Sequence, residues 1–257
     1  MLRLSHINKS FNVGTVDEKQ LFKDFNIEIS KGEFVSVIGS NGSGKTTMLN
    51  IISGDIKPDS GDVFLSGDNI TKMANYKRAR RISRVFQNPS NGTCPTMTIL
   101  ENMSIADNKG KSFNLTKGLN NKRKDFYRSR LETLGMGLEN RLGTLTGSLS
   151  GGQRQALALI MATLAKPDIL LLDEHTAALD PKSADIVMRL TDEVVKENEI
   201  TTVMITHNLR YAVEYGTRTI MMHEGNAIMD VSGIEKSEKT TNDYLKIFNK
   251  ISIECGN

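Results

Sequence analysis

The chain has 257 residues, with 33 basic and 30 acidic side chains and a formal net charge of +3. This length allows one large domain or two small ones. A hydrophobic share of 38% with 25% charged residues is typical of a folded globular protein and excludes a disordered one. The small positive excess does not indicate a nucleic-acid partner. The longest apolar run, residues 156–165, is much shorter than the roughly 20 residues that cross a bilayer, so we expect no membrane span.

The N-terminal residues lack the apolar core and the small-residue cleavage site of a secretory signal. Cys94 and Cys255 lie far apart, which indicates neither a disulfide framework nor a metal site. No metal-binding spacing is found among the four histidines, His6, His175, His207 and His223. We therefore expect a reducing, cytosolic setting.

In chain order, short apolar runs and period-two alternation predict strands, whereas apolar residues at three- and four-residue spacing predict helices. The expected strands cover residues 2–7, 22–29, 33–39, 61–65, 82–86, 169–172, 201–206, 218–223 and 227–231. The expected helices open at Lys45, cover residues 98–106 and 124–134, follow Gly152 and cover residues 182–196. Continuous apolar strands that alternate with helices predict an α/β protein with a parallel core sheet.

The helical stretch lies between the two halves of this predicted core. We expect one domain, with its core at about residues 1–87 and 166–230, a helical insertion at about 88–165 and a short C-terminal tail at 231–257. Residues 107–124 are polar and contain glycine, which predicts a mobile surface loop.

A glycine-rich turn joins the predicted strand 33–39 to the following helix and matches the pattern G-x-x-x-x-G-K-[ST]. Its members are Gly39, Ser40, Asn41, Gly42, Ser43, Gly44, Lys45 and Thr46. Backbone N–H groups of such a turn, together with the helix N-terminus, bind phosphate oxygens. Lys45 adds a positive charge for the β- and γ-phosphates, and Thr46 offers a hydroxyl to Mg²⁺. The alternative is a chance match, which the flanking strand and helix disfavour.

A second candidate site follows the apolar run 169–172, which ends in the carboxylates Asp173 and Glu174. Ligands of parallel α/β sheets bind at the carboxyl ends of the strands. Adjacent side chains on extended backbone point apart. One carboxylate can therefore hold Mg²⁺, through water, while the other takes a proton from an attacking water. The alternative is an ordinary solvated strand end.

The segment 149–153 reads L-S-G-G-Q and precedes a helical pattern. Ser150 and Gln153 have the spacing of a capping box. Gly151 and Gly152 are poor choices for a first helical turn, since glycine costs about 1 kcal/mol relative to alanine in a helix interior. We expect something to approach this backbone closely, and a helix N-terminus with a free hydroxyl can bind an anion.

Taken in this order, the phosphate loop, L-S-G-G-Q and the segment L-L-L-D-E at 170–174 resemble the nucleotide-binding subunits of ATP-binding cassette (ABC) transporters. The resemblance covers about residues 2–230, and L-S-G-G-Q is its most specific part. It implies a P-loop NTPase core with a mostly parallel sheet, an N-terminal antiparallel β subdomain and an inserted helical subdomain. It also implies ATP hydrolysis with Mg²⁺ as cofactor.

The same resemblance implies roles for residues that would otherwise be taken as solvated or structural. Gln87, in V-F-Q-N-P, matches the glutamine that contacts Mg²⁺ and the attacking water, and His207 matches the switch histidine at the γ-phosphate. The implied catalytic residues are thus Glu174, His207 and Gln87, and the implied metal ligands are Thr46, Gln87 and Asp173. Phe11 takes the place of the aromatic residue, usually tyrosine, that stacks on adenine. The implied nucleotide contacts are Phe11, the loop residues Gly39 to Thr46, Thr47, Ser150, Gly151, Gly152, Gln153 and Asp180.

The resemblance also implies partners. Two copies would pack head to tail, with ATP between the phosphate loop of one and Ser150 of the other. The chain would sit on the cytoplasmic face of the membrane through a separate permease, docked near residues 87–103, and an extracytoplasmic solute-binding protein would complete the system. The segment D-E-H-T-A-A-L-D-P is similar to ATPases of aromatic amino-acid importers. The alternatives are an exporter of lipoproteins or peptides and a soluble ATPase of iron–sulfur assembly.

Two features depart from this pattern or lie outside it. His175 stands where the family usually has proline after the catalytic glutamate, and we assign it no catalytic role. We expect four arginines to form a solvated, loosely basic surface before the docking segment: Arg78, Arg80, Arg81 and Arg84.

Overall fold

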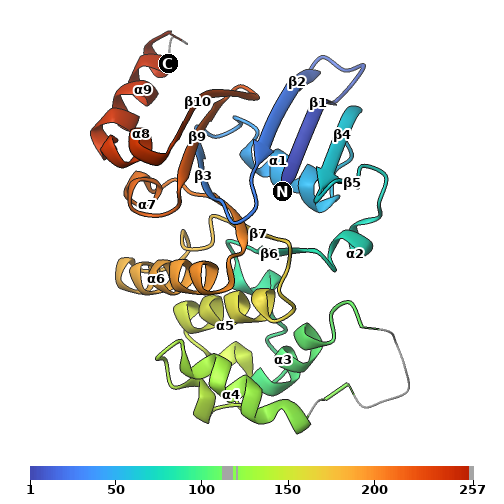
Figure 1. Ribbon diagram of the computed structural model, residues 1–257, viewed down its shortest axis with the longest axis vertical. Coiled ribbons are helices and arrows are strands. Elements are labelled where there is room, and N and C mark those ends of the chain that lie inside the picture. The colour runs from blue at the N-terminus through green and yellow to red at the C-terminus, as the bar shows by residue number, and fades with distance from the viewer. Residues whose placement is uncertain (112–117, 120, 255–257) are drawn as a thin grey trace. The chain divides into compact units, whose positions relative to one another are not determined.

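The computed structural model describes residues 1–111, 118–119 and 121–254 (Figure 1). Part of the loop predicted at 107–124 therefore lies outside the described residues, as does Cys255. The chain forms two compact units: Met1–Arg78 with Glu199–Asn257, called here the first unit, and Ala79–Asn198, called the second unit.

The first unit contains two groups of strands. One is an antiparallel sheet of order β2-β1-β4-β5; in the other, β3 lies between β8 and β9 and is parallel to both, and β10 is antiparallel to β9. Every residue of β3 is buried, as expected of a central strand. The strands are β1 (Leu2–Phe11), β2 (Lys19–Ile29), β3 (Phe34–Gly39), β4 (Ser60–Leu65), β5 (Asp68–Asn69), β8 (Thr201–Ile205), β9 (Arg218–His223) and β10 (Asn226–Ser232).

Helices of the first unit pack on these strands and on each other. They are α1 (Lys45–Ser53), α2 (Asn75–Arg78), α7 (Leu209–Glu214), α8 (Gly233–Glu238) and α9 (Thr241–Glu254). Tyr244 of α9 is fully buried in a cluster with Ile38, Ala212 and Met221. The residues after β10 thus form helices that are attached to the core next to α7 (Figure 1).

Where the structure describes it, the second unit is mainly helical, with a parallel strand pair formed by β6 (Ile82–Val85) and β7 (Ile169–Asp173). Its α-helices are α3 (Ile99–Asp107), α4 (Lys124–Glu132), α5 (Gly151–Thr163) and α6 (Pro181–Asn198). Its described residues also form short 3₁₀ turns: η1 (Pro89–Asn91), η2 (Asn121–Arg123), η3 (Leu138–Asn140) and η4 (Thr146–Ser148). Thr98 and Glu101 form a capping box that fixes the start of α3.

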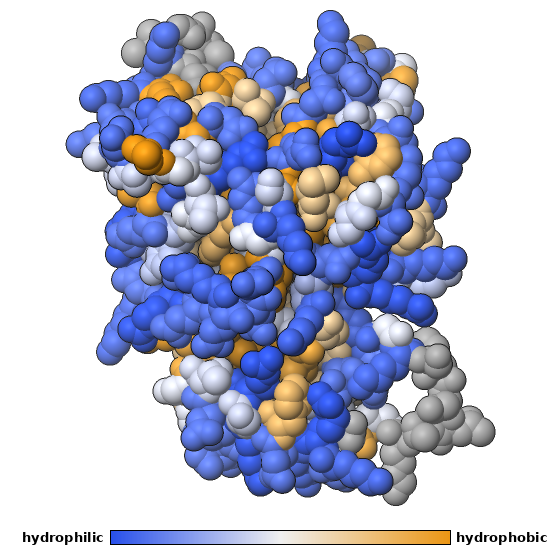
Figure 2. Space-filling view, in the orientation of Figure 1, coloured by the Kyte–Doolittle hydropathy of each residue, from blue (hydrophilic) through white to orange (hydrophobic). Residues whose placement is uncertain are grey.

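The predicted strands and helices are confirmed, and so is the α/β fold class with its antiparallel N-terminal sheet. The boundaries differ at β1, which continues to Phe11 through three irregularities in its register with β2. Among the described residues, no helix has both the length and the hydrophobicity that crossing a bilayer requires. Hydrophilic residues cover most of the face shown in Figure 2.

The expectation of a solvated arginine surface is wrong for Arg78, whose side chain is only 2% exposed. Its guanidinium donates to the carbonyl oxygens of Ile51 and Ile52 at 2.7 and 2.9 Å, and also to those of Thr71 and Met73. The last carbonyls of a helix have no partner within the helix, and arginine offers five donors in a fixed plane. Arg78 therefore binds the C-terminal end of α1, and burial lowers the pKa of its guanidinium.

Candidate nucleotide site

The predicted phosphate loop lies between β3 and α1, and α1 begins at Lys45 as expected. Gly44 precedes the helix with φ of 103°, a conformation that favours glycine. A side chain at Gly39 is excluded, since its Cβ would lie 2.2 Å from the carbonyl oxygen of Met222. Both glycines thus allow the chain to turn tightly from the buried strand into the helix.

Lys45 lies inside this loop, with its side chain 5% exposed. Its Nζ donates to the carbonyl oxygens of Gly39 and Ser40 at 2.8 and 2.9 Å. The hydroxyl of Ser43 is buried and has no hydrogen-bond partner among the described residues. An unsatisfied buried hydroxyl and a buried ammonium in the same loop are expected where a loop receives an anionic ligand. Thr46 is exposed and Thr47 half-buried on the first turn of α1.

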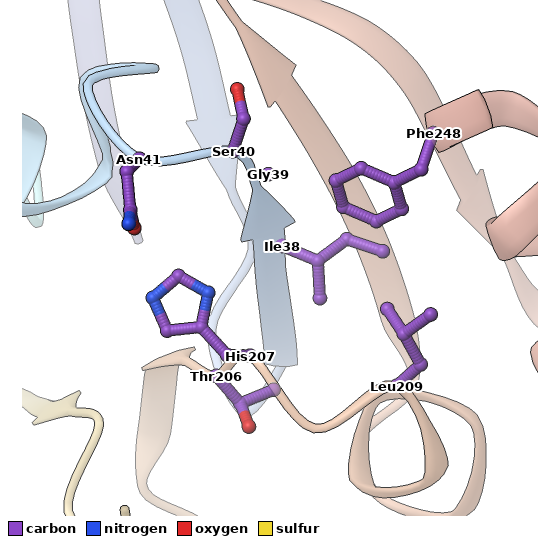
Figure 3. A pocket seen from close by; sticks show the side chains of 8 residues that line it. All are labelled: Ile38, Gly39, Ser40, Asn41, Thr206, His207, Leu209 and Phe248. Atoms are coloured by element: carbon purple, nitrogen blue, oxygen red, sulfur yellow. The ribbon is translucent and has the colours of Figure 1, made fainter. Parts of the chain in front are cut away.

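A pocket of about 320 Å³ opens beside the loop (Figure 3). His207 and Asn41 face one another at one side of it, whereas Phe248 from α9 and Leu209 from α7 point into the other side. The lining residues are Ile38, Gly39, Ser40, Asn41, Thr206, His207, Leu209 and Phe248. The first unit therefore brings His207 to the phosphate loop, as a contact with terminal phosphate would require. Sequence patterns did not indicate Phe248 or Leu209 here.

Phe11, expected to stack on adenine, is the last residue of β1 and is half-buried. The ammonium of Lys9 lies over its ring in a cation–π contact, 5.5 Å from the ring centroid. Phe11 pairs with Lys19 in the antiparallel sheet, which fixes its place at the strand end.

In the second unit, Asp173 ends β7 and is paired with Arg84 of β6, with Nη2 and Oδ2 2.5 Å apart. Arg84 lies opposite Leu171 in the register of the two strands, so it shares a sheet face with Asp173, two residues further along. The two side chains are only 12% and 15% exposed. The expectation of a solvated Arg84 is therefore wrong, because the carboxylate that ends the neighbouring strand holds it.

Glu174 follows with φ of 48° and is half-buried. His175 is 1% exposed, and its Nε2 lies 3.1 Å from the hydroxyl of Thr191 on α6. Burial lowers the pKa of His175 to about 4, so the imidazole is neutral at pH 7. The histidine in place of proline thus belongs to the buried interior, and Thr191, sixteen residues away, gave no sequence signal.

Gln87 is exposed just beyond β6. The residue before it is fixed by α5, since the side chain of Gln155 donates to the carbonyl of Phe86 at 2.9 Å. Gln155 is fully buried, and no sequence pattern indicates its role. The expected metal-contacting glutamine therefore follows an anchored backbone.

The predicted capping box at Ser150 and Gln153 is confirmed, with both reciprocal hydrogen bonds present at 3.2 and 3.3 Å. The glycines between them face other side chains of the same unit. A Cβ at Gly151 would lie 3.2 Å from Leu179, and one at Gly152 would lie 3.0 Å from Ser183. A side chain at either glycine would therefore require Leu179 or Ser183, at or just before the start of α6, to shift by a few tenths of an ångström.

Asp180 precedes α6, and its Oδ1 accepts from the backbone N–H of Ser183 at 3.0 Å. Hydrogen bonds from Ser183 lower the pKa of this exposed carboxyl group. Asp180 therefore acts as an N-cap at the start of α6. In the sequence it lies between Leu179 and Ser183, the residues that face Gly151 and Gly152.

Comparison with known proteins identifies the family to which this geometry belongs. Residues 22–177 match the family model described as ABC transporter. The tyrosine transport ATP-binding protein of Clostridioides difficile (strain R20291) is 50% identical over 248 residues, which cover 96% of this chain and 98% of that protein. The chain belongs to the ABC transporter family. It is an ATP-hydrolysing cassette, and the P-loop fold implied by the sequence is confirmed.

Other relatives agree with this assignment. The ABC transporter ATP-binding protein YxdL of Bacillus subtilis (strain 168) is 33% identical, over 100% of this chain and 95% of the length of YxdL. The ADP conformation of MJ1267, an ATP-binding cassette of an ABC transporter, has a TM-score of 0.80 at 27% identity and covers 98% of both chains. A dimeric post-hydrolysis structure of the cassette MJ0796, bound to ADP and Pi, has a TM-score of 0.75 at 30% identity, over 90% of this chain and 98% of that one.

Proposed function

We propose that this ABC ATPase drives the import of tyrosine or a closely similar aromatic amino acid through a separate membrane permease. The observation that carries the proposal is the 50% identity, over nearly the full length of both chains, to a tyrosine transport ATP-binding protein. The segment D-E-H-T-A-A-L-D-P is similar to ATPases of the same substrate class.

The nucleotide would bind through the phosphate loop. Its backbone N–H groups and the N-terminus of α1 face the phosphates, and Lys45, now bonded to two loop carbonyls, would transfer its ammonium to phosphate oxygens. Phe11 would stack on the adenine. Ser150, with the bare backbone of Gly151 and Gly152, would bind the γ-phosphate of a nucleotide held by a second copy. Support for this comes from the buried Ser43 hydroxyl and from the capped tip of α5.

The donor set of Thr46, Gln87 and Asp173 fits Mg²⁺, which prefers hydroxyl, amide and carboxylate oxygens. When bound, the cation neutralises charge on the β- and γ-phosphates. Asp173 would bind the cation either in place of its ion pair with Arg84 or together with that ion pair.

Hydrolysis would proceed by in-line attack of a water on the γ-phosphate, whose bond to the oxygen bridging the β-phosphate breaks, so that ADP leaves. The Glu174 carboxylate would accept a proton from that water, Gln87 would orient it, and Lys45 with His207 would stabilise the charge that develops on the γ-phosphate oxygens. The pocket that brings His207 beside Ser40 and Asn41 supports this assignment.

The assembly would be a head-to-tail homodimer on the cytoplasmic face of the membrane. The dimeric form of the cassette MJ0796 supports a dimer. The permease would dock near residues 87–103, and an extracytoplasmic solute-binding protein would deliver the substrate.

A Glu174→Gln variant tests the catalytic assignment. It removes the base but keeps the size of the side chain, so we expect steady-state ATP hydrolysis to be nearly abolished and ATP binding to remain. Retained turnover would contradict the assignment of Glu174.

Uptake of labelled tyrosine tests the substrate. Cells that lack this chain should lose tyrosine uptake, and the wild-type chain, but not the Glu174→Gln variant, should restore it. Labelled glycine serves as a control, because its uptake should not depend on this chain. Unchanged tyrosine uptake would overturn import of this substrate and leave export as the alternative.

A further inference from the structure

His175 and Thr191 form a buried polar pair behind the end of β7, and neither side chain is more than 1% exposed. The Thr191 hydroxyl donates to the carbonyl of Val187 at 2.8 Å. Since a hydroxyl has a single proton to donate, Thr191 accepts from His175, whose Nε2 therefore carries the proton. The pair joins the turn after β7 to helix α6 by a hydrogen bond of defined direction.

Glu174, directly before His175, has a left-handed backbone conformation with φ of 48°. For a residue other than glycine this conformation costs on the order of 1 kcal/mol or more and persists only where the surrounding structure fixes it. One fixed point is the hydrogen bond from the Ala177 N–H to the Glu174 carbonyl, at 2.9 Å. Another is the buried imidazole of His175, the next residue along the chain.

We propose that His175 is a positioning residue for ATP hydrolysis. Its hydrogen bond to Thr191 anchors the turn, so that the carboxylate of Glu174 is held where it accepts the proton of the attacking water. The inference rests on the proposed role of Glu174 as the base. A displacement of about 1 Å in catalytic geometry lowers turnover by roughly 100-fold. Loss of the anchor therefore acts on kcat, whereas the phosphate loop, which is built from other residues, keeps its affinity for nucleotide.

Substitutions at Thr191 test this directly. Thr191→Val keeps the shape of the side chain and removes the acceptor of His175, whereas Thr191→Ser keeps the hydroxyl. Thr163→Val is the matched control, because Thr163 is also a buried helical threonine whose hydroxyl donates to the carbonyl four residues earlier, that of Leu159 at 3.1 Å.

We expect Thr191→Val to lower kcat at least roughly tenfold while the Kd for ATP stays unchanged. Thr191→Ser should restore most of the turnover, and Thr163→Val should keep the wild-type kcat. All rates are measured on the full chain and normalised to the folded fraction. Should Thr191→Val not fold, His175→Gln and His175→Leu give the same comparison, because only glutamine retains a donor for Thr191.

Equal kcat values for Thr191→Val and wild type would overturn the proposal, as would an equal loss in Thr163→Val. The Glu174→Gln variant, measured in the same series, separates two failures. If Glu174→Gln retains turnover, the proposed base is wrong. If it loses turnover while Thr191→Val does not, only the positioning role of His175 fails.

Discussion

Arg84 and Asp173 form an ion pair between two parallel strands, with 2.5 Å between Nη2 and Oδ2 and with both side chains largely enclosed. The guanidinium also lies 4.9 Å from the centroid of the Phe86 ring. The carboxylate proposed to hold Mg²⁺ is thus already paired with a cation of the same unit. Arg84 compensates the charge of Asp173 in the nucleotide-free protein.

Arg84→Met should lower the free energy of unfolding of the nucleotide-free protein by about 2 kcal/mol, since it leaves a largely enclosed carboxylate without its cation. Urea unfolding in EDTA measures this loss. Arg81→Met is the control, because the pair of Arg81 with Asp168 is more exposed, at 27% and 40%, and should cost less than about 1 kcal/mol. Equal costs for the two variants would show that enclosure of the Arg84 pair contributes nothing.

Lys45→Ala should weaken ATP binding at least tenfold, because it removes a charged donor worth roughly 1.5–3 kcal/mol to phosphate oxygens. Titration with a fluorescent ATP analogue measures the change. Lys57→Ala, at an exposed lysine of the same unit, is the control and should bind as the wild type does. An unchanged affinity in Lys45→Ala would refute the proposed phosphate contact.

The secondary structure could be predicted because it depends on local periodicity, and the start of α1 at Lys45 and the capping box at Ser150 needed only short spacings. Contacts between distant segments were not predictable in this way. Arg84 meets Asp173 across 89 positions, and His175 meets Thr191 across a turn and half a helix. Hydropathy marks arginine and histidine as surface residues, whereas buried partners decide where these side chains lie.

His175 should make stability depend on pH. The pKa of His175 is about 4 in the folded protein, and its ordinary value is 6.5. Between pH 4 and pH 6.5 the imidazole is therefore protonated in the unfolded chain but neutral in the folded protein. The contribution of His175 to the free energy of unfolding is complete above pH 6.5. As the pH falls towards 4, this free energy decreases by roughly 3 kcal/mol. Urea unfolding from pH 8 to pH 4 measures it, with His175→Gln as the comparison. If the free energy of unfolding falls with pH equally in His175→Gln and in the wild type, protonation of His175 is not the cause of the loss.

Ser150→Ala should prevent ATP-driven dimerisation, since it removes the hydroxyl proposed to bind the γ-phosphate of the second copy. Loss of the N-cap of α5 adds about 1 kcal/mol of destabilisation. Light scattering with ATP, in a Glu174→Gln background that retains nucleotide, measures the dimer. Ser148→Ala is the control two residues earlier, where the hydroxyl donates to the carbonyl of Leu145, the residue directly before η4. If Ser150→Ala dimerises at the same ATP concentration as Ser148→Ala, the tip of α5 takes no part in binding the partner's nucleotide.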